Sequence, residues 1–213
     1  ICVTDVFGGL WPMMQKMGIK YLMVFTDAAK TQADTRGDLQ LLATSGPWKI
    51  YRVDDSDVVV PLTYQPVVVE GRSGDQRERN LELGTSWFQQ SDEWAAMPAD
   101  DGPAEWQRIE VQVDLDRQVG TAPMEPGRKV DIVVPAEIIE RVALPAITIS
   151  NYEMGDQDLS FDVSQIGVPV LVKMSYFPNW QVEGAQGPYR IAPNFMVVVP
   201  TATHVSFHYE ASA

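Results

Sequence analysis

Residues 167–210 read GVPVLVKMSYFPNWQVEGAQGPYRIAPNFMVVVPTATHVSFHYE and have the most regular pattern in the chain. Apolar or aromatic residues occupy every second position at both ends of this segment: Val168, Val170, Val172, Met174 and Tyr176, then Val205, Phe207 and Tyr209. A period of two places each set on one face of a strand. Turn residues such as Pro178, Gly184 and Pro193 lie between them, so the segment is predicted to be a meander of short strands.

The same alternation extends backwards from this meander to about residue 105. It is found in three further segments: Ile109 to Leu115, Val130 to Val134, and Leu159 to Val163. Six or more short strands of this kind indicate a mainly β fold, an antiparallel β-sandwich or jelly roll over residues 105–213.

The first 70 residues predict a small α/β unit in the order helix, strand, helix, hairpin. The helices are expected at 7–17 and 28–33, the second capped by Thr26, and the strands at 20–25, 39–43 and 48–53. Residues 71–104 are predicted to be a linker, with a charged loop at 71–79 and a helix over 81–97. Trp87 and Trp94 would share a face of that helix, more typical of a core than of a sugar platform.

Composition limits the classes of partner. The net charge of −13 argues against nucleic acid and against an anionic membrane surface, because both need clustered basic residues. No run of about eighteen apolar residues occurs, so no segment is expected to insert into the bilayer. The chain begins at Ile1 without an initiator methionine, and we expect it to be part of a longer protein.

No catalytic residue is predicted. Motifs for a serine nucleophile or a phosphate-binding loop are absent from the sequence. His204 and His208 would lie about 13 Å apart along a strand, too far to share one ion, and are expected to face solvent. Carboxylate pairs such as Asp100 with Asp101 are expected by chance in so acidic a chain. A glycosidase would need two carboxylates facing each other across a cleft.

The aspartates Asp54, Asp55 and Asp57 form the one weak candidate for a metal site. Dense carboxylates suit Ca²⁺, which takes several oxygen ligands. The segment lacks the spacing and the distal glutamate of an EF-hand loop, and a solvated turn is the stronger interpretation.

Carbohydrate recognition is the remaining candidate activity. Tyr176, Trp180, Tyr189 and Arg190 lie together in the sequence, and aromatic faces beside a guanidinium suit sugar rings. The alternative is that these aromatic residues, Trp180 above all, pack in the sandwich core.

The terminal segment resembles the C-terminal extracytoplasmic region of YfhO-like polytopic membrane proteins, which belong to the GT-C glycosyltransferase superfamily. The residues that match its aromatic turn, glycine hairpin and closing strand are Tyr176, Phe177, Pro178, Trp180, Gly184 and Tyr209. Residues 17–22, 45–48 and 51–53 are similar to its first strand and hairpin. The acid-rich composition of this chain resembles the actinobacterial form of the region.

This resemblance implies an extracytoplasmic domain of a membrane glycosyltransferase whose catalytic acid lies elsewhere. Its expected partners are the membrane portion of its own chain and a cell-envelope glycan. Some relatives carry a label related to 6-pyruvoyl-tetrahydropterin synthase. That enzyme needs three histidines for zinc, and this chain has two.

Three hypotheses follow. The first is a non-catalytic domain that assists a membrane glycosyltransferase, holding acceptor glycan. The second is a structural or protein-interaction domain, which an exposed apolar patch would favour. The third is a secreted glycoside-active enzyme.

Overall fold

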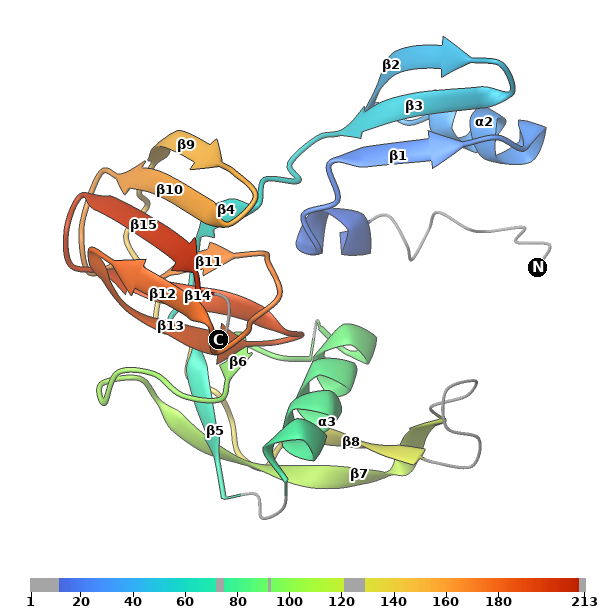
Figure 1. The fold of residues 1–213 in the computed structure, drawn as a ribbon. Helices are drawn as coiled ribbons and strands as arrows, with labels where there is room; N and C mark the ends of the chain where they lie inside the picture. Colours follow the sequence, from blue (N-terminus) through green and yellow to red (C-terminus); the bar gives the residue numbers. More distant parts are fainter. Residues whose placement is uncertain (1–11, 72–74, 92, 121–128, 211–213) are drawn as a thin grey trace. The chain divides into compact units, whose positions relative to one another are not determined.

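The computed structural model describes residues 12–71, 75–91, 93–120 and 129–210. The chain divides into two compact units, and the division falls between Val58 and Val59 (Figure 1). We describe each unit by itself. Both are rich in strands, and the mainly β fold class predicted from the sequence is confirmed.

Unit 1 is a three-stranded antiparallel sheet with helix α2 (Asp27–Asp34). The sheet has the order β1 (Tyr21–Val24), β3 (Trp48–Val53), β2 (Leu39–Ser45). Thr26 caps α2 as predicted, since its hydroxyl accepts from the backbone N–H of Ala29 at 3.3 Å. The core of the unit is small: Met14, Val24, Ala33, Tyr51 and Val53.

Tyr51 ties the core of unit 1 to α2. Its hydroxyl donates to Asp34 at 2.6 Å, and Lys49 reaches the other oxygen of the same carboxylate at 2.6 Å. Burial and the neighbouring carboxylate together raise the pKa of Tyr51 to about 12, so the neutral phenol is the stable form.

Unit 2 contains a four-stranded antiparallel sheet in the order β12 (Trp180–Glu183), β15 (His204–Tyr209), β10 (Asp158–Val163), β9 (Ile149–Met154). Alternate residues of β10 and β15 are buried as the pattern predicted, with Phe161 and Val205 fully enclosed. Figure 1 shows this sheet lying over strands β11, β13 and β14, which gives a sandwich-like arrangement of two layers.

The second sheet of unit 2 has eight strands in the order β4, β11, β14, β13, β6, β5, β7, β8. Their bounds are β4 (Val59–Pro61), β5 (Val67–Glu70), β6 (Pro98–Ala99), β7 (Arg108–Gly120), β8 (Lys129–Pro135), β11 (Val170–Val172), β13 (Ala185–Ile191) and β14 (Phe195–Pro200). The sheet is mixed, because β5 pairs in parallel with β6 and with β7.

Helix α3 (Gln76–Gln89) lies against β7 and β8 in Figure 1. Ser86 fixes it there, since its buried hydroxyl accepts from the backbone N–H of Val133 at 2.8 Å and donates to Glu82 O at 2.6 Å. A hydroxyl that bonds a strand N–H this way satisfies a buried donor that would otherwise be costly. The helix therefore has one register on the sheet.

Three boundary predictions differ from the structure. The expected divisions at residues 70 and 104 fall inside unit 2, because β5 and β6 pair with strands on both sides of them. The strand expected from 168 to 176 is reduced to Val170–Val172, and residues 168–172 are buried on both faces instead of alternating. Helix α3 begins before the expected residue 81 and ends before Trp94. Part of the helix expected at 7–17 lies outside the described residues, and 12–16 are helical.

Candidate functional site

Two pockets flank α3, within unit 2. We call them the Arg79 pocket and the Asn80 pocket, after the neighbouring helix residues that line one each. Because residues 79 and 80 are adjacent on the helix, their side chains point about 100° apart, which places the pockets on adjoining sides.

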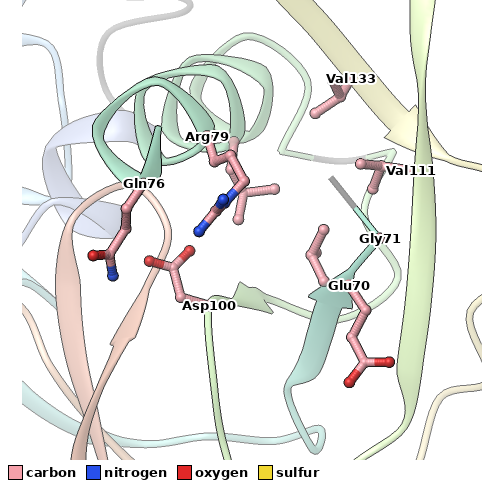
Figure 2. Close-up of a pocket in the computed structure, with 9 residues that line it drawn as sticks. Glu70, Gly71, Gln76, Arg79, Asp100, Val111 and Val133 are labelled. Carbon is pink, nitrogen blue, oxygen red and sulfur yellow. The ribbon is translucent and has the colours of Figure 1, made fainter. Parts of the chain in front are cut away.

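The Arg79 pocket has a volume of about 470 Å³. Apolar and charged side chains line it together: Val69, Glu70, Gly71, Gln76, Arg79, Leu83, Asp100, Val111 and Val133. In Figure 2 the Arg79 guanidinium and the Asp100 carboxylate point toward each other, while the Glu70 carboxylate points away from both. Glu70 instead accepts from Arg108 at 2.7 Å. Two carboxylates line this pocket, but they do not face each other.

Asp100 is the most perturbed carboxylate of the two pockets. It directly follows β6, and its backbone N–H donates to Arg190 O at 3.0 Å. Burial raises the pKa of Asp100, and this outweighs the opposing effects of Arg190, Arg79 and the amide of Asn80. Its Oδ2 is buried without a hydrogen-bond partner among the described residues. The carboxylate thus lies between an arginine of each pocket.

The Asn80 pocket has a volume of about 490 Å³ between α3 and the turn that joins β13 to β14. Its lining consists of Arg77, Asn80, Leu81, Gly84, Thr85, Phe88, Arg190, Pro193 and Asn194. The mixture is aromatic, amide and guanidinium, and no acidic residue is among these lining residues.

Asn80 and Asn194 give this pocket its unusual chemistry. Asn80 is 6 % exposed, although most asparagines are exposed. Its amide influences the Asp100 carboxylate, yet Nδ2 makes no hydrogen bond of standard geometry within the described chain. Asn194 Oδ1 is likewise buried and unpartnered. Both asparagines line this pocket, and each carries one buried amide atom without a hydrogen-bond partner among the described residues.

Backbone contacts hold the far wall of the Asn80 pocket in place. The turn follows a cis peptide bond between Ala192 and Pro193. Asn194 O then accepts from the backbone N–H of Tyr176 at 2.8 Å. Arg190 lies over the Tyr176 ring, with its guanidinium carbon 5.7 Å from the ring centroid, a cation–π distance. Tyr176 and Arg190, two of the four predicted sugar-binding residues, are thus brought together at this pocket.

The other two predicted sugar-binding residues lie elsewhere. Tyr189 precedes Arg190 on β13 and packs edge-on against Trp106, with ring centroids 5.8 Å apart. Trp180 is 9 % exposed and packs against Tyr209 and Phe207 at centroid distances of 5.2 and 6.3 Å. Trp87 and Trp94 are both buried, so neither presents a platform to a ligand.

The aspartates considered for calcium form a turn after β3. Hydrogen bonds anchor this turn within unit 1: Asp54 N–H donates to Asp38 O at 3.1 Å, Gln15 Nε2 donates to Asp54 O at 2.9 Å, and Ser56 Oγ donates to Val53 O at 2.7 Å. Asp55 has a left-handed backbone with φ of 54°. Within the described ranges, no three His, Cys, Asp or Glu side chains are grouped as metal ligands.

The two histidines face solvent, as predicted. His204 Nδ1 lies 2.7 Å from Asp162, and His208 Nδ1 lies 2.6 Å from Asp158, each pair across β10 and β15. Asn151 and His204 together lower the pKa of Asp162 by hydrogen bonding to its charged form. These are separate surface pairs, each with its own acid.

The sequence interpretation missed Asn80, Arg77, Arg79 and Asn194, and it treated Asp100 as a chance carboxylate. One local signal was available. Asp75 and Glu78 have the three-residue spacing of a capping box, and Asp75 does cap α3 by accepting from Arg77 N–H at 2.9 Å. Placing the helix start there would have put the arginines on a helix and not in a loop.

No described helix combines the length and the apolar character that a membrane crossing requires. Comparison with known proteins gives no match, whether to family models, to curated proteins or to solved structures.

Proposed function

We propose that this chain is a non-catalytic, carbohydrate-binding domain on the extracytoplasmic side of a membrane glycosyltransferase of cell-envelope assembly. The observation that carries the binding part is the Asn80 pocket, which combines unsatisfied amide groups with Arg190 and the exposed ring of Phe88. Sugar hydroxyls both donate and accept hydrogen bonds, so they satisfy Asn80 Nδ2 and Asn194 Oδ1 at once. A sugar ring presents an apolar face to Phe88.

The membrane glycosyltransferase part of the proposal rests on the resemblance of residues 176–209 and of residues 17–22. Its catalytic acid would lie elsewhere in the longer protein. The Arg79 pocket gives little support to a hydrolase within this chain, since Glu70 is paired with Arg108 and turned away from Asp100.

A specific observation also favours the second hypothesis, protein interaction. The face of the unit 1 sheet opposite α2 is apolar and open, with Tyr21, Met23 and Phe25 each more than half exposed. Trp48 extends this face, its ring centroid 5.1 Å from that of Phe25. Soluble domains seldom leave such a set uncovered. In the proposal this face attaches unit 1 to the membrane portion of its own chain, while unit 2 holds the glycan.

Arg190→Ala tests the binding proposal. We expect about tenfold weaker binding of envelope oligosaccharides, because a charge-assisted hydrogen bond contributes about 1.5–3 kcal/mol. Isothermal titration on the full chain measures the affinity. Arg141→Ala is a matched control, because Arg141 also lies over a tyrosine, Tyr64, at 5.2 Å, but lines neither pocket. Equal oligosaccharide affinities for the two variants would contradict a role of Arg190 in sugar binding.

Fractionation of source cells tests the membrane assignment separately. An antibody against this chain is expected to detect a species much larger than 23.7 kDa in the membrane fraction. A soluble species near 23.7 kDa would contradict the proposed attachment to a membrane enzyme, without bearing on sugar binding.

A further inference from the structure

The charge of the Asn80 pocket is opposite to that of the chain. Asp and Glu outnumber Lys and Arg by 29 to 16 in the whole sequence. Yet the lining of this pocket contains Arg77 and Arg190 and no acid. In a chain so acidic, a pocket lined by two guanidiniums marks a local site for an anionic group.

Asp100 interacts with one arginine of this pocket, Arg190, but not with Arg77. Asp100 lines the other pocket and not this one. It also interacts with Arg79 of the other pocket, so its one negative charge is shared between two arginines. Arg77 is on the exposed surface of α3, where its guanidinium is accessible to a ligand.

We propose that the ligand of the Asn80 pocket is an acidic sugar, a glycan residue that carries a carboxylate. This inference rests on the proposed function and specifies its ligand. The carboxylate lies between Arg77 and Arg190, whose planar donors fit two carboxylate oxygens. The hydroxyls of the same residue bond Asn80 Nδ2 and Asn194 Oδ1, and the ring packs on Phe88.

The geometry distributes these roles over three elements. Arg77, Asn80 and Phe88 come from α3, Arg190 comes from β13, and Asn194 comes from the turn before β14. The helix holds the backbone of Asn80, and the bond from the Tyr176 N–H to Asn194 O holds the backbone of Asn194, so the two main-chain positions are fixed before a ligand arrives. A site organised in advance loses less entropy on binding.

The test is a glycan array that pairs each uronic-acid oligosaccharide with its carboxyl-reduced counterpart, probed with the full chain. The reduced sugar keeps every hydroxyl and replaces the carboxylate by a neutral hydroxymethyl group. We expect at least about tenfold tighter binding of the acidic member, the size of one charge-assisted hydrogen bond. Arg77→Gln should reduce that preference to about twofold or less.

Two variants act as controls. Arg52→Gln removes the same charge from unit 1, and it should leave the preference unchanged if the effect is local and not one of net charge. Arg79→Gln removes an arginine from the other pocket. Loss of the preference in Arg79→Gln, with Arg77→Gln unaffected, would place the carboxylate in the Arg79 pocket and overturn the inference.

The remaining outcomes separate the two proposals. Equal binding of acidic and reduced members would overturn the acidic-sugar inference and leave carbohydrate binding intact. Binding of neither member of any pair would overturn the proposed carbohydrate function, and the inference with it.

Discussion

Replacement of Trp180 with alanine is expected to lower the free energy of unfolding of unit 2 by about 3–5 kcal/mol. Trp180 is 9 % exposed at the start of β12 and pairs with Tyr209 of β15 in register. Its ring meets those of Tyr209 and Phe207 edge-on, at interplanar angles of 75° and 79°. Removing it leaves a cavity inside the sandwich that these aromatic neighbours cannot fill. Denaturant unfolding followed by far-ultraviolet circular dichroism measures the loss.

Phe177→Ala is the matched control for this experiment. Phe177 lies three residues earlier and contacts the same Tyr209, at a centroid distance of 6.5 Å, but it is 51 % exposed. Its truncation should cost about 1 kcal/mol or less, as is usual for surface positions. A Trp180→Ala protein with unchanged stability and lost sugar binding would contradict the packing role and return Trp180 to the candidate site.

The contrast between Trp180 and Arg190 shows what the sequence could predict. Both lie in one segment whose alternation correctly predicted β15 and the general meander, because period-two patterns report which face of a strand is buried. The pattern does not report which aromatic residue enters the core. That depends on the pairing of β12 with β15, two strands separated by twenty residues that include the whole of β13 and β14.

The Asn80 pocket lay beyond sequence reasoning for a related reason. Its walls come from α3 and from the β13–β14 turn, which are about a hundred residues apart in the chain. They meet because β6 pairs with β13 on one side and with β5 on the other. A two-residue strand such as β6 has no periodicity to detect. Asn80 itself offered one indication, since asparagine is a poor residue for a helix interior.

The parallel strands escaped prediction as well. Alternation correctly identified residues 109–115 as a strand, but it gives no direction relative to a neighbour. In the structure Val68 and Arg108 are register partners in a parallel pair, and β5 lies inside the large sheet between β6 and β7. Because the strands of sandwich folds are usually antiparallel, antiparallel pairing was expected throughout, and the parallel pairs of β5 were not predicted.

Gly84→Ala is expected to destabilise unit 2 by about 1–3 kcal/mol, although alanine is the better helix former. A Cβ at this position would lie 2.5 Å from the backbone oxygen of Pro193 and 3.3 Å from its carbonyl carbon. Neither atom belongs to a flexible side chain, so the helix or the turn must shift. In an exposed helix the same change would stabilise the protein by about 1 kcal/mol, so the sign of the measured effect decides whether this contact is present.

The same substitution should weaken sugar binding, because Gly84 and Pro193 both line the Asn80 pocket. Moving α3 away from the β13–β14 turn separates Asn80 from Asn194, and a ligand would no longer reach both amides. Gly155→Ala is the control, since the nearest atom to its Cβ would be Asp158 O at 3.9 Å. Thermal unfolding and titration with the array-selected sugar measure the two effects. A stabilised Gly84→Ala protein with normal affinity would contradict the close packing of α3 against the β13–β14 turn. The two walls of the Asn80 pocket would then lie farther apart than described.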